Sequence, residues 1–362
     1  MGDICCFDSF SSDMPERWRQ FIDQNALTFD QTLPWFIEFE RHLLGPSQHL
    51  HILAVEEAAA GPLALLPLST DRIALAGPIS VTGLTALSNY YTAFFAPLAV
   101  ANRDRGIAQA LVQGISELDA DNAVIDINPL ASDSRMVAEM ASEWMQRNYE
   151  IERYFRFGNW HLKLAGRTSQ EYLASLPGHV RSTLVRKGKK MHARSDASIR
   201  IVTAVADVPA AMDAYEAVYL SSWKIDEPHK EFIRSIATEF ARRNWLRLGL
   251  VEIGSRPIAA QIWFVYRGTA SIFKLAYDAE FRNISAGSLL TMTLMQHVID
   301  VDKVTTVDYL CGDDPYKRDW MSARHERIGI RAVRRFSWPG VLNRVTGVAR
   351  RILPDSVSRA SD

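Results

Sequence analysis

Residues 270–300 read ASIFKLAYDAEFRNISAGSLLTMTLMQHVID, and this stretch decides the fold. Its apolar start predicts a strand over Ala270–Asp278, and its apolar second half predicts a helix over Ser288–Asp300. The loop Asp278–Gly287 therefore leads from a strand into a helix, whose free N–H groups and positive partial charge can hold a phosphate. The alternative is an ordinary turn in which Ser285 is the N-cap.

The elements around this stretch predict a three-stranded antiparallel meander with helices before and after it. Short apolar segments are separated by turn residues, which is the pattern of hairpins. The predicted elements are helices at 210–224 and 231–244, strands at 246–253, 258–266 and 270–278, a helix at 288–300, and strands at 305–310 and 328–335. A basic helix over Ser169–Arg194 precedes them.

The first half of the chain repeats this order of elements. The predicted elements are strands at 50–56, 62–68, 73–76, 79–81 and 91–95, a helix at 104–118, a strand at 123–127, a helix at 134–147 and a strand at 149–157. One plan used twice predicts an α/β (α+β) fold with two tandem domains, each a mixed, mostly antiparallel sheet flanked by helices. We expect domains at 1–160 and 161–340, with the basic helix 169–194 in the second and a tail at 341–362.

Composition places the chain among globular proteins. Of its 362 residues, 48% are hydrophobic and 23% charged, and the net charge of -1 does not indicate a polyanion partner. The three cysteines, the neighbours Cys5 and Cys6 and the distant Cys311, lack the spacing of a metal site and predict a reducing compartment and no metal. The N-terminus lacks the pattern of a signal peptide, and breakers interrupt the uncharged stretch between Arg72 and Arg103. We therefore expect a cytoplasmic protein without a membrane span.

Polar residues interrupt three of the predicted apolar strands. Gln261, Lys274 and Asp308 each interrupt a strand whose other residues are mostly apolar. A charge buried in such a strand without a partner is costly. The three interruptions predict a polar pocket across one sheet face. A buried Lys274–Asp308 ion pair with a purely structural role is the alternative.

In the strand before the loop, the alternation of residues predicts which side chains share a face. Alternation places Lys274 and Asp278 on one face. It places the apolar residues Phe273, Leu275 and Tyr277 on the other.

A second polar loop follows a strand end at Gly312-Asp313-Asp314-Pro315-Tyr316-Lys317-Arg318-Asp319-Trp320. Loops at strand ends commonly carry functional groups. Tyr316 is a candidate proton donor to a leaving thiolate, and Asp278 or Asp314 is a candidate acceptor of the proton from an attacking amine. The alternative is a capped turn in which Asp313 or Asp314 starts a helix.

Residues 160–340 resemble the acyltransferases of the GNAT superfamily that include CelD-type cellulose-biosynthesis proteins, and more distantly the Fem-type peptidyltransferases. The resemblance rests on several blocks in the same order. They are Ser222-Trp223-Lys224, Pro257-Ile258-Ala259-Ala260-Gln261, Lys274-Leu275-Ala276-Tyr277-Asp278 with Phe281 and Ser285-Ala286-Gly287, and the loop from Gly312 to Lys317 with Trp320. The first half, with Ser88-Asn89-Tyr90-Tyr91, resembles the companion domain of such proteins.

The resemblance implies two tandem GNAT-like domains and a thioester donor. In that superfamily the donor's pyrophosphate lies on the loop with the pattern Gln/Arg-x-x-Gly-x-Gly/Ala. The residues placed there are Arg282, Asn283, Ile284, Ser285, Ala286, Gly287 and Ser288, and Ser285 replaces the first glycine. The predicted substrate-binding residues are Gln261, Lys274 and Asp308, from the polar interruptions of the strands, together with Trp223 and Lys317. Residues 103–108 match the same loop pattern in the first half.

The resulting expectation is an N-acyltransferase that uses acyl-CoA or acetyl-CoA, or an acyl carrier protein. The expected acceptor is an amine of a small or cell-envelope or exopolysaccharide-related molecule. One alternative is a Fem-like transferase that uses aminoacyl-tRNA, in which the basic run Arg181–Arg194 would meet phosphates rather than form a solvated helix face. Another alternative is a non-catalytic partner of a polysaccharide-biosynthesis complex.

Overall fold

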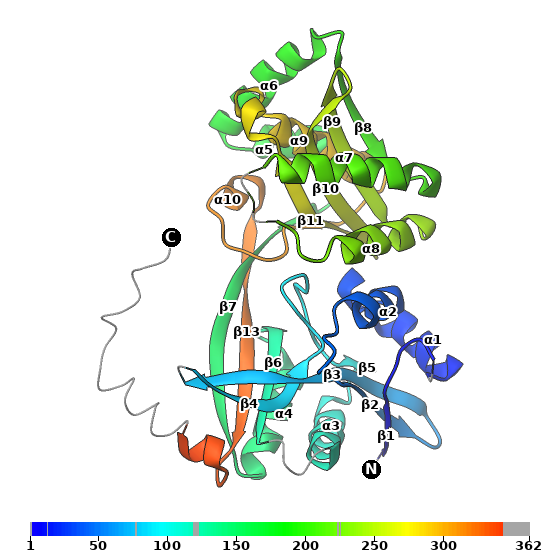
Figure 1. Cartoon of the computed structure of the whole chain (residues 1–362), viewed down its shortest axis with the longest axis vertical. Coiled ribbons are helices and arrows are strands. Elements are labelled where there is room, and N and C mark those ends of the chain that lie inside the picture. Colours follow the sequence, from blue (N-terminus) through cyan, green and yellow to red (C-terminus); the bar gives the residue numbers. More distant parts are fainter. Residues whose placement is uncertain are drawn as a thin grey trace, which may run out of the picture. The chain divides into compact units, whose positions relative to one another are not determined.

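The structure is a computed structural model of the chain. It describes residues 2–12, 14–76, 78–118, 123–222, 224 and 226–342. The chain divides into two compact units (Figure 1). The first unit comprises residues 1–25, 44–156 and 326–362, and the second comprises 26–43 and 157–325. The predicted contiguous division at 160/161 lies close to the change of unit at 156/157, but 26–43 and 326–342 fall in the other unit.

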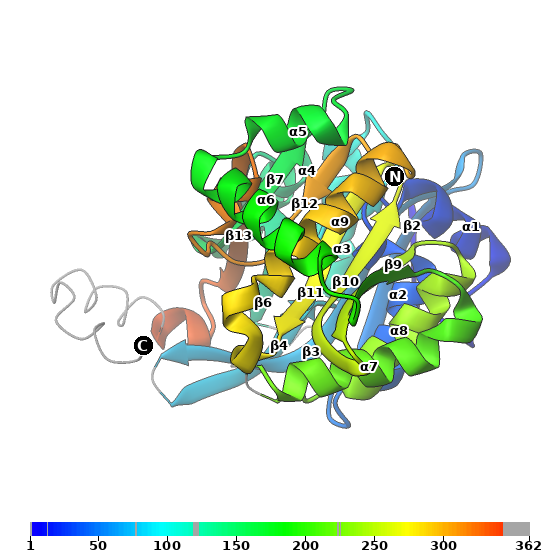
Figure 2. The same ribbon diagram turned by 90° about the horizontal axis from the view of Figure 1, so that it is seen from above.

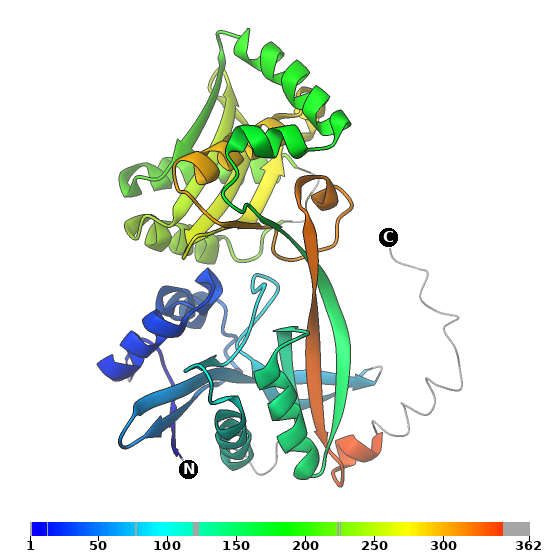
Figure 3. The same cartoon turned by 180° about the vertical axis from the view of Figure 1, so that it is seen from behind.

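The first unit is a mixed sheet with helices. Its strands are β1 (Asp3–Phe7), β2 (Leu50–Glu57), β3 (Gly61–Ala76), β4 (Ile79–Ala86), β5 (Leu98–Ala99), β6 (Val124–Ala131), most of β13 (Ala323–Arg334) and the first part of β7 (Tyr149–Lys163). Their order is β1-β2-β3-β4-β6-β13-β7, with β5 on β3. Its helices are α1 (Glu16–Asn25), α3 (Asp104–Leu118) and α4 (Arg135–Gln146). Figure 3 shows α3 and α4 side by side on the sheet.

The second unit repeats this plan. Its strands are β8 (Ala197–Val202), β9 (Leu246–Ile253), β10 (Arg256–Tyr266), β11 (Thr269–Tyr277) and β12 (Thr306–Asp308), in the order β12-β11-β10-β9-β8, and β12 also pairs with the end of β7. Its helices are α2 (Leu33–His42), α5 (Ser169–Ser175), α6 (Gly178–His192), α7 (Val208–Leu220), α8 (Lys230–Arg242), α9 (Ala286–Asp300) and α10 (Lys317–Trp320). Short 3-10 helices are η1 (Phe29–Gln31), η2 (Val205–Asp207) and η3 (Ala279–Ile284).

One face of the second unit's sheet is covered by α9. Gly249 of β9, Gln261 of β10 and Leu275 of β11 are directly paired across these antiparallel strands, so their side chains share a face. Gly249 lies against Leu290 of α9, where a larger side chain would meet it. Figure 2 shows α6 beside α9 on this side of the sheet.

The opposite face carries an aromatic core. Phe264 of β10 and Phe273 of β11 contact Phe29 of η1, and Trp35 of α2 packs edge-on against Phe232 of α8. This cluster explains why residues 26–43 fold with the second unit: burial of large aromatic side chains is among the strongest packing contributions available. Figure 1 shows α7 and α8 across the same strands.

Three sequence-based element predictions are wrong. The strands predicted at 62–68 and 73–76 are one continuous strand, β3. Residues Tyr91–Phe95 form no strand; the chain there turns, and the Phe95 N–H donates to the carbonyl of Pro129 in β6 at 2.7 Å. The basic helix 169–194 is two helices, α5 and α6, because Pro177 holds the residue before it in an extended conformation. The tail beyond residue 342 lies outside the described residues. Within those residues, no helix combines the length and apolar composition needed to cross a membrane.

Candidate functional site

The second unit has a short parallel strand pair beside a longer strand. β11 and β12 are paired only from Thr269↔Thr306 to Ser271↔Asp308, whereas β11 continues to Tyr277. Backbone groups along an edge without a neighbouring strand are available to other partners. In this part of β11 the carbonyl of Leu275 accepts a hydrogen bond from Lys224 Nζ at 2.7 Å. Because β12 ends early, a gap in strand pairing remains beside the later residues of β11, and the Lys224 side chain enters it.

A β-bulge in β11 decides which side chains reach this gap. Ile262 pairs with Lys274, but the next residue of β10, Trp263, pairs with Ile272, so Phe273 is an extra residue. An extra residue in one strand interrupts the alternation of side chains. Phe273 therefore lies on the same side as Lys274, whose ammonium is 5.8 Å from the ring centre, and the predicted alternation holds only beyond the bulge.

Lys274 forms a buried ion pair, with a partner that the sequence analysis did not identify. Its Nζ lies 2.6 Å from Glu227 Oε2, and the two side chains are only 14% and 5% exposed. Burial lowers the pKa of Lys274, and the bond to Glu227 acts in the opposite direction. Asp308 is instead bonded by Asn159 Nδ2 at 2.6 Å and by the N–H of Leu310 at 2.7 Å. The alternative Lys274–Asp308 pair is therefore wrong.

Gln261 is also separated from Lys274. Its Nε2 donates to Gly287 O at 3.0 Å and to Thr291 Oγ1 at 2.8 Å, and its Oε1 accepts from Trp263 Nε1 at 2.8 Å. Because Gln261 pairs directly with the neighbour of Lys274 in β11, the two side chains point to opposite faces. The structure does not gather Gln261, Lys274 and Asp308 into one pocket, and Gln261 fastens α9 to the sheet.

The loop after β12 directs a second lysine into the interior. Lys317 is 4% exposed, and its Nζ donates to the carbonyls of Cys311 and Gly312 and lies 3.3 Å from Asp314 Oδ2. Gly312 has φ +102°, and a Cβ there would come within 3.1 Å of the Lys317 ammonium. The positive φ favours glycine at this position, and a larger residue would also have to displace the Lys317 ammonium slightly.

Lys224, Lys274 and Lys317 lie together. The pKa of Lys224 is lowered to about 8 by burial and by repulsion from Lys274 and Lys317, against attraction to Asp314 and Glu227. Like charges close to a desolvated ammonium favour its neutral form. Neither Lys224 nor Glu227 was predicted to act in the site; the only sequence signal was that Lys224 belongs to the block Ser222-Trp223-Lys224. Trp223, predicted to bind substrate, lies outside the described residues.

Tyr316 lies at the start of α10, next to the lysines. It is 43% exposed, and its ring packs edge-on against Tyr309 with centres 5.8 Å apart. Partial burial and the nearby Asp314 raise the pKa of Tyr316, so its phenol keeps its proton near neutral pH. Asp313 is held by Arg324 and by Trp160 Nε1, at 2.6 and 2.7 Å. Neither aspartate caps α10 through its side chain, so the capped-turn alternative is wrong.

The predicted donor loop is fixed at its start by Asp278. This carboxylate is 2% exposed, accepts from the N–H of Glu280 at 3.0 Å and lies 2.6 Å from Arg256 Nη2. Ser285 is the N-cap residue of α9, as the alternative predicted, but it has φ +60° and its side chain makes no cap hydrogen bond. Intrahelical bonding in α9 begins with Leu289 N–H to Ser285 O. The N–H groups of 286–288 therefore stand at the open helix end.

The basic helix α6 lies next to this loop. The ammonium of Lys187 donates to the carbonyl of Asn283, and α6 packs against α9. Arg282 and Asn283 are exposed, while Ile284, Ser285, Gly287 and Ser288 are half-buried and Ala286 is buried. The positive charge of Lys187 in α6 therefore lies against the loop that was predicted to hold phosphate.

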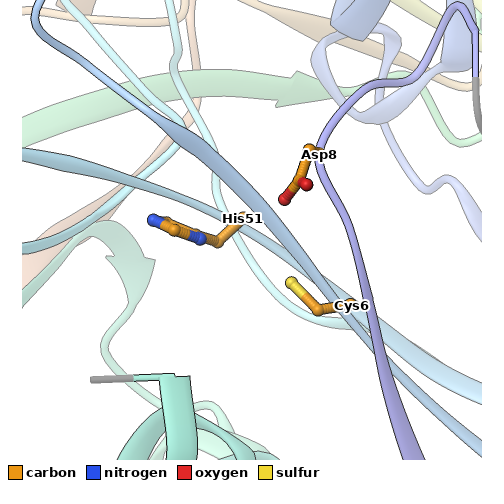
Figure 4. Close-up of side chains that lie close together, drawn as sticks. All are labelled: Cys6, Asp8 and His51. Carbon is orange, nitrogen blue, oxygen red and sulfur yellow. The ribbon is translucent and has the colours of Figure 1, made fainter. Parts of the chain in front are cut away.

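A separate group of possible metal ligands lies in the first unit. β1 and β2 bring the side chains of Cys6, Asp8 and His51 together, with one ligand atom of each within 4.8 Å of the others (Figure 4). Burial and the charge of Asp8 raise the pKa of the Cys6 thiol to about 11. A metal ion there would have to displace the thiol proton, because the thiolate is the ligand.

A comparison with protein families finds one match, and it lies in the second unit. Residues 178–318, which lie within the second unit, match the family described as the acetyltransferase (GNAT) domain. A comparison with curated proteins finds no match.

Solved structures extend the likeness in fold to nearly the whole chain. FemX superposes with a TM-score of 0.62 at 10% identity, covering 88% of this chain and 96% of that one. The tandem GNAT protein from the clavulanic acid biosynthesis pathway superposes with a TM-score of 0.51 at 13% identity, covering 91% and 98%. The C-terminal domain of a putative lysylphosphatidylglycerol synthetase from Agrobacterium fabrum superposes with a TM-score of 0.53 at 10% identity, covering 92% of this chain and 96% of that one. The predicted fold of two tandem GNAT-like domains is thus confirmed.

Proposed function

We propose that the second unit transfers an acyl group from a thioester to an amine. The observation that carries the proposal is the gap between β11 and β12, which adjoins the N-terminal end of α9 inside the segment that matches the GNAT domain. The proposed donor is acyl-CoA, such as acetyl-CoA, or an acyl carrier protein. The proposed acceptor is a small or cell-envelope or exopolysaccharide-related amine.

The residues at the start of α9 fit the phosphates of such a donor. Three N–H groups, of Ala286, Gly287 and Ser288, precede the first intrahelical bond and point out of the helix end. Arg282, exposed in η3, adds a positive charge. The donor would supply the activated acyl group, and this loop would hold its phosphates.

The other groups would assist the attack of the amine. Tyr316 keeps its proton and can give it to the leaving thiolate. Asp314, which is 58% exposed, is the proposed proton acceptor. Asp278 was the other candidate, but its carboxylate is held by Arg256 and the Glu280 N–H, so we assign it to shaping the loop. Positioning of amine and thioester would be the main contribution.

The test is a thermal-shift titration with CoA, acetyl-CoA and longer acyl-CoAs. A ligand at a hundred times its Kd stabilises by about 2.7 kcal/mol, a rise in Tm of about 5–10 °C. Gly287→Glu adds a negative charge to the first turn of α9, where it would repel the phosphates, and should abolish the rise. Gly106→Glu is the matched control, because it makes the same change in the first turn of α3, where the space is open. A rise that survives Gly287→Glu would contradict the proposed loop.

An aminoacyl-tRNA donor is the second candidate. It is favoured by the basic helix α6 beside the loop, and FemX and the lysylphosphatidylglycerol synthetase domain share the fold. In the same titration, stabilisation by aminoacyl-tRNA but not by CoA, falling steeply with salt, would favour it. No response to any donor would favour a non-catalytic partner of a polysaccharide-biosynthesis complex.

A further inference from the structure

Three possible metal ligands of different chemistry meet on the first unit's sheet. They are the thiol of Cys6, the carboxylate of Asp8 and the imidazole of His51, and one ligand atom of each lies within 4.8 Å of the other two. Figure 4 shows the three side chains around a common space. The group lies outside residues 178–318, the segment that matches the GNAT domain, so the proposed acyl transfer does not account for it.

The register of two strands brings these three residues together. In the antiparallel pair of β1 and β2, Cys6 stands opposite Leu53, and the same register continued by two residues places Asp8 opposite His51. Residues two apart in a strand share a face of the sheet, and so do residues directly opposite each other. Backbone pairing therefore holds the three side chains on one face before any ion binds. The spacing of cysteines and histidines along the chain does not reveal such a site, because strand pairing creates it.

The three side chains are accessible from solvent. Cys6 and Asp8 are exposed, and His51 is half-buried. In the part of the chain that the structure describes, Asp8 takes part in no ion pair, so no arginine or lysine has to leave it before a metal ion binds. Cys6 Sγ makes a long contact of 3.9 Å to the carbonyl of Phe7, which is a weak hydrogen bond that a metal ion can replace.

A divalent cation would also change the electrostatics of the thiol. Without an ion, burial and the charge of Asp8 hold the proton on Cys6, while a backbone hydrogen bond from Ile52 favours the thiolate. A cation between Asp8 and Cys6 would outweigh the charge of the carboxylate, and a thiol that coordinates such an ion loses its proton to water. The carboxylate that opposes ionisation of the thiol would then be a second ligand of the same ion.

The chemistry of the three ligands selects zinc. Zn²⁺ binds sulfur, nitrogen and oxygen ligands in a tetrahedron, with bond lengths of about 2.0–2.3 Å. Ligand atoms of such a tetrahedron are about 3–4 Å apart, so atoms that already lie within 4.8 Å of one another need only small side-chain rotations. Ca²⁺ and Mg²⁺ prefer oxygen ligands throughout, which a thiol and an imidazole do not provide.

We propose that Cys6, Asp8 and His51 bind a zinc ion that fastens β1 to β2, with water as the fourth ligand. β1 is the first strand in the order of the sheet, and β2 is its neighbour. An ion shared between the two strands would stabilise the folded chain, because the three ligands come together only when the strands are paired. This site goes beyond acyl transfer and does not depend on it.

The first test uses Co²⁺ as the probe, because it occupies zinc sites and because a thiolate bound to it absorbs in the near ultraviolet. The full chain, without an affinity tag and freed of metal by a chelator, should gain this absorption with Co²⁺ and lose it when Zn²⁺ is added. Cys6→Ala should not gain it. Cys5→Ala is the matched control and should behave like the wild type, because Cys5 pairs with Ala54 and points to the other face.

Two results of this titration would overturn the proposal. One is the absence of the absorption in the wild type. The other is absorption that persists in Cys6→Ala, because another cysteine would then be the ligand.

A second measurement tests the other two ligands through the affinity for Zn²⁺. Asp8→Ala and His51→Ala should each weaken binding by at least about 100-fold, since loss of a mere supporting residue already costs about 10- to 100-fold. Asp3→Ala and His49→Ala are the controls, because Asp3 stands opposite Glu56 on the other face and His49 is an exposed histidine outside the group. Equal affinities in all four variants would overturn the assignment of the ligands.

Thermal unfolding tests whether the ion fastens the strand. Zn²⁺ at a hundred times its Kd should raise the Tm of the wild type and of Cys5→Ala by about 5–10 °C and leave that of Cys6→Ala unchanged. An equal rise in all three proteins would overturn the proposal. Each of these measurements is made without an acyl donor, so failure of the zinc site and failure of the proposed function are distinguishable.

Discussion

Both units contain a parallel strand pair that ends early, but they fill the space beyond it differently. In the first unit β4 and β6 are paired only at Leu84↔Ile125 and Thr85↔Asp126. Beyond this pair, Ser88 Oγ donates to Asn128 O at 2.6 Å, and Phe95 N–H donates to Pro129 O. The chain itself therefore occupies the edge of β6.

In the second unit the corresponding space is lined by side chains. Beyond Ser271↔Asp308, the carbonyl of Leu275 meets the ammonium of Lys224, and the ion pair of Lys274 with Glu227 lies close by. Side chains can move aside or bind a ligand, whereas a bonded backbone segment must unfold locally to do so. The comparison teaches that repeating a fold does not repeat a site. We therefore place the proposed reaction in the second unit.

The largest expected effect is the loss of stability when the buried ion pair of the second unit, Lys274 with Glu227, is broken. Glu227→Gln removes the charge beside Lys274 and should lower the free energy of unfolding by ~3–5 kcal/mol, because it leaves a buried ammonium without its counterion. Urea unfolding measures this loss. Asp126→Asn in the first unit should cost only ~1–3 kcal/mol, because its partner Arg331 is 20% exposed and better solvated.

A double variant separates stability from function in the same place. Glu227→Gln combined with Lys274→Met should recover most of the lost stability, since no charge is then left unpaired. The double variant should nevertheless lack acyl transfer if Lys274 orients the substrate. Unchanged turnover in Lys274→Met alone would contradict a role for this lysine.

The next effect concerns the two tyrosines beside the two strand pairs. Tyr316→Phe should lower kcat about hundredfold, because the leaving thiolate loses its proton donor. Tyr154→Phe in the first unit removes a hydroxyl that bonds Asp126 and should leave kcat unchanged. Steady-state kinetics with a saturating donor measures both. Equal losses in the two variants would mean that both units take part in the reaction.

The smallest expected effect is the change in stability when the glycine that lets a helix pack closely on the sheet is replaced in each unit. The first unit places a glycine on the helix, Gly114 of α3 against Leu53, and the second places one on the strand, Gly249 of β9 against Leu290. Gly249→Ala should cost ~1–2 kcal/mol from overpacking. Gly114→Ala should cost less, because alanine favours the helix by ~1 kcal/mol. Thermal unfolding of the two variants tests this order, and the reverse order would contradict it.

Local patterns in the sequence were enough to predict many of the helices and strands. The helix Asp104–Leu118 and the strand Leu246–Ile253 have the predicted bounds, because a run of apolar residues at the helical or strand period depends only on neighbours in the chain. A connection between a strand and a helix at Asp278–Gly287 was predicted for the same reason, and the structure has β11 end at Tyr277 and α9 begin at Ala286. The placement of Lys317 and Tyr316 after a strand end also followed from local order.

The tertiary structure alone decided which side chains meet. The sequence does not mark the bulge at Phe273, which places this ring beside Lys274, because a bulge depends on the register with β10. The pairing of Lys274 with Glu227 joins residues 47 apart, and residues 26–43 join the second unit through aromatic contacts. Periodicity shows which face of an element is buried. It cannot show what lies opposite, because that is set by packing between segments distant in the chain.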